Sequence, residues 1–442
     1  MRERLFGTDG VRGLAGTDLT RELAFDLGRA AVAVLGRHGQ GQPTVVVGRD
    51  PRESGGWLED AIGEGIRAAG GDVILAGVEP TPAIAYLTTS LGASAGVVIS
   101  ASHNPPEYNG IKFFASTGMK LPDEQEDEIE AALGSVVPAG TEPGSVRAIG
   151  PSEQTYLDHL VDAADARLDG MTVVVDCANG AAFIDAPEVL RRLGATVHPI
   201  NASPDGHNIN ANCGALHPDV VAAEVVRIGA DAGVAHDGDA DRALFADSEG
   251  NVLTGDQVLA ACAIDLHERG VLTNDMVVAT VMSNLGFFRA MQTAGIEAVA
   301  AKVGDRYVLE EMHRTGAVLG GEQSGHVIFA EHATTGDGLL TAVRFLGLSA
   351  RTGASITQLG ARMQRFPQVL INVLVADRSA LEGRGVSAAV ESAEAELGDR
   401  GRVLVRASGT EPLVRVMVEA ETEDTARRHA EMIAARVREA RA

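Results

Sequence analysis

Three carboxylates at alternate positions are the strongest chemical signal in this 442-residue chain. They belong to Asp237, Asp239 and Asp241. Carboxylates this close repel one another unless a cation lies among them, and oxygen-only ligands at this charge density indicate Mg²⁺. An EF-hand is excluded, because its glycine position would hold Arg242 and its glutamate position Ser248. The apolar residues 232–235 before the cluster favour a metal loop over the alternative, a solvated acidic turn.

Ser102 is a second candidate reactive group, because it stands where an apolar run ends. Residues 97–99 are typical of a buried strand, and Pro105 and Pro106 prevent helix and ladder pairing soon afterwards. The hydroxyl is therefore expected in a surface loop at the carboxyl end of a strand, where open α/β sheets bind ligands. It is a candidate nucleophile or phosphate carrier, and an ordinary turn serine is the alternative. His103 beside it is a neighbour that shapes the loop or contacts phosphate.

Two further loops offer ligands for an anion and for a sugar. The anion loop consists of Arg406, Ser408, Gly409 and Thr410, with Arg415 as a second guanidinium. Hydroxyls, backbone N–H groups and guanidinium together make a phosphate cradle, although a plain Ser-Gly turn is the alternative. Glu322 and Ser324 are two residues apart, so in an extended loop both side chains point one way, toward vicinal hydroxyls. His326 in the same loop is a candidate acid or base, or a structural histidine.

Two basic side chains complete the set. Arg12 lies in a glycine-rich turn, and Lys112 follows Ser102 by ten residues. Either cation would neutralise charge that develops during phosphoryl transfer. The alternatives are a tight turn for the first and the start of a hairpin for the second.

A repeated α/β arrangement must position these loops. A buried strand, a helix and a second strand occur three times, with the strands at 45–47 and 72–75, 173–175 and 196–200, and 277–279 and 298–300. The predicted left-handed helix stops before the second strands are Gly70, Gly194 and Gly295. Each unit then adds a strand that runs into a polar loop, at 96–106, 232–242 and 318–326. This pattern predicts mostly parallel sheets covered on both faces.

The fold class that follows is α/β: three similar α/β domains with mixed, mostly parallel sheets, and a C-terminal α+β domain. The active site is expected in the central cleft. The predicted domains are 1–150, 151–250, 251–365 and 366–442. The stretch 137–151, rich in proline, glycine and serine, is predicted to be a linker. The last domain is predicted to hold strands at 369–375, 403–405 and 414–418 and a helix at 424–438.

Composition excludes two classes of partner. The net charge of −24 argues against nucleic acids and anionic membranes, which bind basic surfaces. The three isolated cysteines are typical of a reducing compartment, without disulfides or a zinc site. The chain starts without an apolar signal segment, and no stretch is long enough to span a bilayer. We therefore expect a cytoplasmic protein.

In their order along the chain, the four loops resemble the signature loops of the phosphohexomutase superfamily. The resemblance covers essentially the whole chain and rests on residues 101–105, 237–242, 321–326 and 406–412. Gln323 and the runs 7–13 and 304–308 resemble one branch of that superfamily, the bacterial phosphoglucosamine mutases. Hexose-specific relatives carry a histidine-containing loop near the position of Asp305. Here Asp305 is expected either to favour a substrate with a 2-ammonium group or to pair with Arg306.

The resemblance implies a reaction and its cofactors. Ser102 is expected to be a phosphoserine, and one Mg²⁺ per chain to be bound by Asp237, Asp239, Asp241 and a phosphoserine oxygen. Glucosamine 6-phosphate is expected to become glucosamine 1-phosphate through glucosamine 1,6-bisphosphate, a bisphosphate that also serves as activator. The product would supply UDP-N-acetylglucosamine and peptidoglycan precursors. A priming kinase is one expected source of the first phosphate, and a homodimer is one option for the oligomeric state.

The resemblance also assigns roles to residues. The implied substrate-binding residues are Glu322, Ser324, Arg406, Ser408, Gly409, Thr410, Arg415, Arg242 and His103. Lys112 and His326 are the implied candidates for acid–base work, and Arg12 is expected near the phosphoserine. Three other functions stay open: a phosphomannomutase or phosphoglucomutase of the same mechanism, a non-catalytic phosphosugar-binding protein, and a Mg²⁺-dependent phosphatase.

Overall fold

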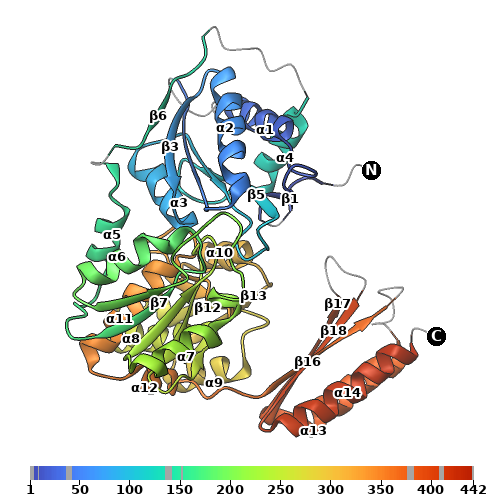
Figure 1. Ribbon diagram of the computed structural model, residues 1–442. Coiled ribbons are helices and arrows are strands. Elements are labelled where there is room, and N and C mark those ends of the chain that lie inside the picture. The colour runs from blue at the N-terminus through green and yellow to red at the C-terminus, as the bar shows by residue number, and fades with distance from the viewer. Residues whose placement is uncertain are drawn as a thin grey trace. The chain divides into compact units, whose positions relative to one another are not determined.

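Four β-sheets organise the chain in the computed structural model, which describes residues 4–7, 9–35, 42–134, 142–150, 153–375, 383–407 and 413–440. The chain divides into two compact units. The first unit comprises Met1–Val281 and Ile296–Ala361 and holds three mixed sheets. The second comprises Met282–Gly295 and Arg362–Ala442 and holds one antiparallel sheet (Figure 1).

The first sheet has the order β1-β5-β4-β2-β3-β6. Its strands are β1 Val11–Leu14, β2 Thr44–Arg49, β3 Asp72–Val78, β4 Ala95–Ile99, β5 Tyr108–Ala115 and β6 Val146–Ala148. The helices of this region are α1 Arg21–Leu35, α2 Glu53–Ala68, α3 Thr81–Ser90 and α4 Asp123–Ala132. Helices α1 and α2 pack closely, so that a Cβ added to Gly28 in α1 would lie only 2.4 Å from the carbonyl oxygen of Ile62 in α2.

The second and third sheets follow the same plan. The second has the order β11-β10-β9-β7-β8, with β7 Thr172–Asp176, β8 Thr196–Ile200, β9 Ala232–His236, β10 Ala243–Asp247 and β11 Val252–Leu253. The third has the order β13-β12-β14-β15, with β12 Met276–Thr280, β13 Glu297–Ala301, β14 Leu319–Gly321 and β15 Val327–Phe329. The other helices of the first unit are α5 Tyr156–Asp162, α6 Asp185–Arg192, α7 Pro218–Ile228, α8 Gly255–Glu268, α10 Asp305–Thr315, α11 Gly338–Thr352 and α12 Ile356–Gly360.

The three mixed sheets share one topology. The matching strand orders are β5-β4-β2-β3, β10-β9-β7-β8 and β15-β14-β12-β13. In each, the first-named strand is antiparallel to its neighbour and the others are parallel. The predicted α/β fold, with three similar domains of mixed, mostly parallel sheets, is therefore confirmed. The predicted glycine stops are also confirmed, since the φ angles of Gly70, Gly194 and Gly295 are 85°, 100° and 76°.

The three polar loops that carry the candidate site residues occupy equivalent places in this topology. Each leaves the carboxyl end of a parallel strand and enters the antiparallel strand beside it: β4 to β5, β9 to β10, and β14 to β15. The strands themselves are buried; all five residues of β4 and all five of β9 are buried. A buried strand followed by a sharp reversal is what presents polar side chains at one edge of each sheet.

The second unit contains the predicted α+β domain and, in addition, residues 282–295, which the sequence prediction assigned to the third α/β domain. Its sheet has the order β16-β18-β17, with β16 Gln368–Leu374, β17 Gly401–Ala407 and β18 Leu413–Ala420. Its helices are α9 Leu285–Ala294, α13 Arg384–Leu397 and α14 Glu423–Glu439. The side chain of Thr422 accepts a hydrogen bond from the N–H of Thr425, and this cap explains why α14 begins where it does.

One expectation about the connections is wrong. The predicted linker 137–151 contains β6, which pairs in parallel with β3, although residues 135–141 and 151–152 lie outside the described residues. The backbone pairing of β6 needs no apolar side chains, and all three of its residues are exposed, so hydrophobic periodicity does not reveal it. Among the described residues, no helix is both long and apolar enough to cross a membrane.

Candidate active site

Ser102 lies in the loop between β4 and β5 with only 2% of its surface exposed. Its Oγ donates a hydrogen bond to Oδ2 of Asp237 at 2.7 Å and lies 3.4 Å from Nδ1 of His103. Its φ of 50° is in the left-handed region that non-glycine residues rarely adopt. Strain of this kind persists where surrounding contacts hold it, as in many active sites. The expected surface position of this hydroxyl is wrong, because the aspartate loop packs over it.

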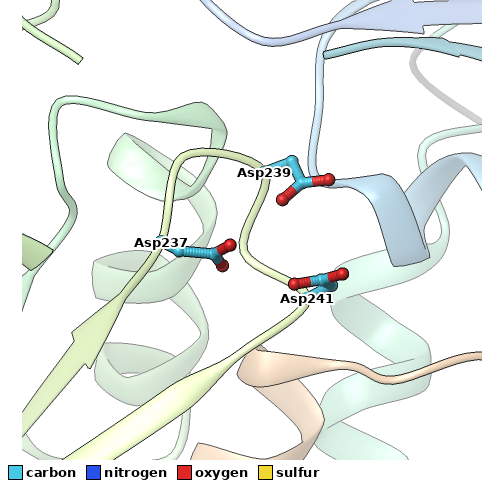
Figure 2. A group of neighbouring side chains, drawn as sticks. All are labelled: Asp237, Asp239 and Asp241. Atoms are coloured by element: carbon cyan, nitrogen blue, oxygen red, sulfur yellow. The ribbon is translucent and has the colours of Figure 1, made fainter. Parts of the chain in front are cut away.

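The aspartate loop and the Ser102 loop approach each other at the level of the backbone. A Cβ on Gly238 would lie 2.4 Å from the carbonyl oxygen of Ser102, so glycine is required there. The φ of Ala240 is 57°, again in the left-handed region. The small residues between the aspartates thus let the chain turn tightly. Figure 2 shows the three aspartate side chains on the single loop that joins β9 to β10.

The three carboxylates form a buried group that fits a metal ion. Asp237, Asp239 and Asp241 are 1%, 1% and 6% exposed, and a ligand oxygen from each lies within 4.8 Å of the others. In each carboxylate, Oδ1 is buried and accepts no hydrogen bond from the described residues, although Oδ1 of Asp241 lies 3.6 Å from Nε of Arg242. Burial, followed by repulsion from Asp241 and Asp239, raises the pKa of Asp237 well above its ordinary value. Such a site is stabilised by a cation that satisfies the unused oxygens.

Lys112 connects the first sheet to this group. Its Nζ, on a side chain only 2% exposed, lies 2.9 Å from Oδ2 of both Asp239 and Asp9. Burial opposes the charge of Lys112, but the two carboxylates outweigh it and raise its pKa. Thr81 also contacts Asp239, through its Oγ1 to Oδ2 at 2.7 Å and its N–H to the carbonyl oxygen at 2.9 Å. The N-terminus of α3 therefore faces a carboxylate, which its dipole favours.

A cavity of about 380 Å³ opens beside this group. Its polar lining includes Asp9, Arg12, His103, Asp241, Arg242, Asp305, Glu322 and His326. Arg242 faces two metal-loop carboxylates, with Nε 3.6 Å from Asp241 and 4.0 Å from Asp237. Burial and the guanidinium groups of Arg242 and Arg12 lower the pKa of His103. The cavity therefore joins predicted site residues from the β4–β5, β9–β10 and β14–β15 loops.

The loop with the predicted sugar ligands contributes Glu322 and His326 to the wall of this cavity. Oε1 of Glu322 accepts a hydrogen bond from the N–H of Gly304 at 2.9 Å, and Oε2 lies 3.5 Å from Oγ of Ser324. His326 is 2% exposed, and its Nδ1 is 3.4 Å from Oδ2 of Asp241. Its Nε2 has no hydrogen-bond partner among the described residues. Burial lowers the pKa of His326, but the nearby carboxylates, first that of Asp241, outweigh it and raise the value.

Lys120 is a site residue that motif reasoning missed. It contacts Oδ1 of Asp9 at 2.5 Å and also Oδ2 of Asp305, so one cation links the N-terminal turn to the start of α10. Asp305 therefore pairs with Lys120, whereas the guanidinium of Arg306 pairs with Asp123 and Glu310. Neither Thr81 nor Lys120 belongs to a recognisable motif. In the sequence, Thr81 is only a polar residue at the start of a helix, and Lys120 is only a lysine that follows a strand.

The residues predicted to bind phosphate belong to the second unit. Arg406 and Arg415 are directly opposite each other in the β17–β18 pair. Burial and the facing Arg415 lower the pKa of Arg406, and Nε of Arg406 has no hydrogen-bond partner among the described residues. Two cross-strand guanidinium groups are destabilising unless an anion lies between them. Ser408, Gly409 and Thr410 lie outside the described residues.

The similarity of this chain to known proteins extends over nearly its whole length. Four models of the phosphoglucomutase/phosphomannomutase family match: alpha/beta/alpha domain I at 3–136, domain II at 154–250, domain III at 254–366 and the C-terminal domain at 370–436. The phosphoglucosamine mutase of Frankia casuarinae is 55% identical over 99% of this chain and 98% of its own, and that of Acidothermus cellulolyticus 54% over 99% and 96%. The crystal structure of a phosphoglucomutase/phosphomannomutase family protein from Burkholderia thailandensis has a TM-score of 0.83 and 26% identity, over 100% of this chain and 98% of that one.

Proposed function

The chain belongs to the phosphoglucomutase/phosphomannomutase family, and we propose that it is an isomerase that interconverts glucosamine 6-phosphate and glucosamine 1-phosphate. Identity above 50% over nearly the full length of phosphoglucosamine mutases supports this substrate. The contact between Oγ of Ser102 and the carboxylate group of Asp237 is the observation that carries the phosphoryl-transfer chemistry. The product would feed synthesis of UDP-N-acetylglucosamine and peptidoglycan precursors.

The proposed reaction has two phosphoryl transfers. Phosphorylated Ser102 donates its phosphoryl group to the 1-hydroxyl of glucosamine 6-phosphate; the bond to Oγ breaks as the bond to the sugar forms. The resulting 1,6-bisphosphate reorients and returns its 6-phosphoryl group to Oγ of Ser102; the bond to the sugar 6-oxygen breaks, and glucosamine 1-phosphate leaves. Lys112 and Arg12 neutralise charge on the transferred group, because the first borders the aspartates and the second lines the cavity. His326 and Lys112 are the proposed candidates for proton transfer. Nε2 of His326 is buried without a hydrogen-bond partner among the described residues, and Lys112 is bound by two carboxylates.

The aspartate group fits one Mg²⁺. Asp237, Asp239 and Asp241 would hold the ion through carboxylate oxygens that accept no hydrogen bond from the described residues, together with an oxygen of phosphorylated Ser102. When bound, the ion would neutralise the charge of the transferred group.

The proposed substrate ligands form two sets. In the first, Glu322 and Ser324 would bind sugar hydroxyls, and Arg242 and His103 would contact the substrate from the cavity wall. In the second, the phosphate that is not transferred would bind to the anion loop. Its proposed ligands are Arg406, Ser408, Gly409, Thr410 and Arg415.

A substrate panel tests the proposed specificity. We expect kcat/KM for glucosamine 6-phosphate to exceed the values for glucose 6-phosphate and mannose 6-phosphate on the purified full chain. A tenfold preference for either neutral sugar, about 1.4 kcal/mol, would replace the proposal with a phosphoglucomutase or phosphomannomutase.

Intact-mass measurement tests the chemistry separately. Exposure to a sugar bisphosphate and Mg²⁺ should add one phosphate to the chain, at Ser102. A chain that binds phosphosugar but never gains phosphate would be a non-catalytic binding protein. Steady release of free phosphate without isomerised sugar would instead identify a phosphatase.

Four accompanying proposals concern the context of the reaction. Ser102 receives its first phosphate from a priming kinase or from a sugar bisphosphate, and separate incubation with each distinguishes the two sources. The location is cytoplasmic, supported by the three isolated cysteines. A homodimer is testable by sedimentation. Four domains with boundaries near residues 150, 250 and 365 are supported by the four sheets, and limited proteolysis would test them.

A further inference from the structure

We propose that Arg52 is a positioning residue for phosphoryl transfer, which holds the backbone of the Ser102 loop so that the hydroxyl stays on Asp237. This inference rests on the proposed function, because it concerns the same serine. The Arg52 side chain is 0% exposed, although it carries a full charge on a large polar head. Arginine is seldom buried this completely unless its N–H groups are all used.

The guanidinium of Arg52 donates hydrogen bonds to four carbonyl groups of one loop. The acceptors are the carbonyl oxygens of Ser102 at 2.9 Å, Asn104 at 2.8 Å, Tyr108 at 3.1 Å, and Pro105. These carbonyls span the loop from the end of β4 to the start of β5. A single buried cation thus replaces the water that would otherwise solvate the loop backbone.

Asp50 completes the support from the other side. It pairs with Nε of Arg52 at 2.9 Å and accepts a hydrogen bond from Oγ of Ser100 at 2.5 Å. The same Oγ accepts the N–H of Ser102 at 3.0 Å. The N–H of Ser102 is therefore tied to the Asp50–Arg52 pair through Ser100, and its carbonyl is tied to it directly. Both peptide groups that define its left-handed backbone conformation are held.

A second domain adds to this support. Nδ2 of Asn210 donates to the carbonyl oxygens of Ser102 at 2.9 Å and Asn104 at 3.2 Å, two of the acceptors that Arg52 uses. Loss of the Arg52 contacts would leave those carbonyls held only by a neutral amide. The loop would then relax toward ordinary φ values and move Oγ away from Asp237.

Arg52→Lys tests geometry rather than charge. An ammonium group can still pair with Asp50 but cannot reach four carbonyls in a planar fork. On the full chain with glucosamine 6-phosphate, we expect kcat to fall by about 100-fold. The KM for the sugar phosphate should change less than about twofold, since Arg52 does not line the cavity. Phosphate transfer from a sugar bisphosphate to Ser102, followed by mass, should slow in parallel.

Two matched variants keep the test decisive. Arg67→Lys changes an arginine in the last turn of α2, the helix that Arg52 precedes as the N-cap residue. Arg67 donates to the carbonyl oxygen of Gly144 at 2.8 Å, and its substitution should leave kcat unchanged. Ser100→Ala removes the hydrogen bond to the N–H of Ser102. Like Arg52→Lys, it should lower kcat, and the protein should remain folded. An unchanged kcat in folded Arg52→Lys, or in Ser100→Ala if the first variant does not fold, overturns the inference. Absence of turnover in the wild type would overturn the proposed function instead.

Discussion

Single residues in this site are chosen for space as much as for chemistry. Gly238 is needed because any side chain there would collide with the carbonyl oxygen of Ser102. Ser102 itself has a backbone conformation that favours glycine, so its hydroxyl is kept at a conformational cost of about 1–2 kcal/mol. A strained backbone conformation at Ser102 agrees with the proposed use of its hydroxyl.

Removal of the Ser102 hydroxyl separates activity from stability. Ser102→Ala and Ser102→Gly should both lose turnover and phosphate incorporation, because neither has Oγ. Glycine should be the more stable variant by about 1 kcal/mol, since it adopts φ near 50° without steric cost. Thermal denaturation and intact mass measure the two effects, and phosphate incorporation by either variant would contradict the role of Ser102.

Loss of one metal-loop charge should weaken cation binding. Asp239→Asn removes a carboxylate that Lys112 and Thr81 orient. We expect the Mg²⁺ affinity to fall by at least about tenfold, and kcat with it. Titration of activity against Mg²⁺ measures the effect. Asp231→Asn, an exposed site that can still accept the N–H of Thr172, is the control, and identical Mg²⁺ titrations for both variants would refute the ligand role.

At the scale of elements, one connection type is used three times. A parallel strand ends, the chain makes a polar loop, and an antiparallel strand returns beside it. The first residues of two helices also contribute to the site. Thr81 at the start of α3 donates a hydrogen bond to Asp239, and Asp305 at the start of α10 lies in the cavity wall. The site is therefore assembled from the ends of elements whose bodies are buried.

The cap of α11 should respond to pH. Asp337 is 2% exposed and accepts hydrogen bonds from the N–H of Leu340 at 2.8 Å and the hydroxyl of Tyr156 at 2.9 Å. Burial raises its pKa to about 6. The folded chain therefore binds this proton more tightly than the unfolded chain, so the stability it contributes is present at pH 4 and lost as pH rises through 6.

Asp337→Asn should remove this dependence while it keeps an oxygen for the cap. Relative to the wild type, the variant should gain about 2 kcal/mol in the free energy of unfolding at pH 7.5, and little at pH 4.5. Denaturant melts of both proteins at the two pH values give the comparison. An equal difference at both values would show that the carboxyl does not titrate in this range.

At the scale of the molecule, the proposed substrate ligands form two groups. Ser102, the aspartates and the cavity belong to the first compact unit, and Arg406 and Arg415 belong to the second. A phosphomutase needs both, because one phosphate must be held while the other is transferred.

Removal of a phosphate-binding guanidinium should affect binding more than metal chemistry. Arg406→Ala should raise KM for glucosamine 6-phosphate by about tenfold or more, because a charged hydrogen bond to phosphate is worth about 1.5–3 kcal/mol. The Mg²⁺ dependence should stay unchanged. Arg400→Ala, at the residue just before the first residue of β17, is the control in the same domain. Circular dichroism shows whether the domain remains folded, and an unchanged KM in folded protein would refute the assignment.

The amino-acid sequence by itself determined the four loops, their ligand types and the repeated α/β plan, because each is encoded by neighbouring residues with a distinctive chemistry or period. Tertiary structure alone decided which of them meet. Ser102 and Asp237 are 135 residues apart, Lys112 and Asp239 are 127 apart, and Lys120 and Asp305 are 185 apart. Such pairs depend on how separate sheets pack, and no local pattern records that. The burial of Ser102 and the support from Arg52 and Asn210 belong to this second class, since only packing shows which backbone groups water cannot reach.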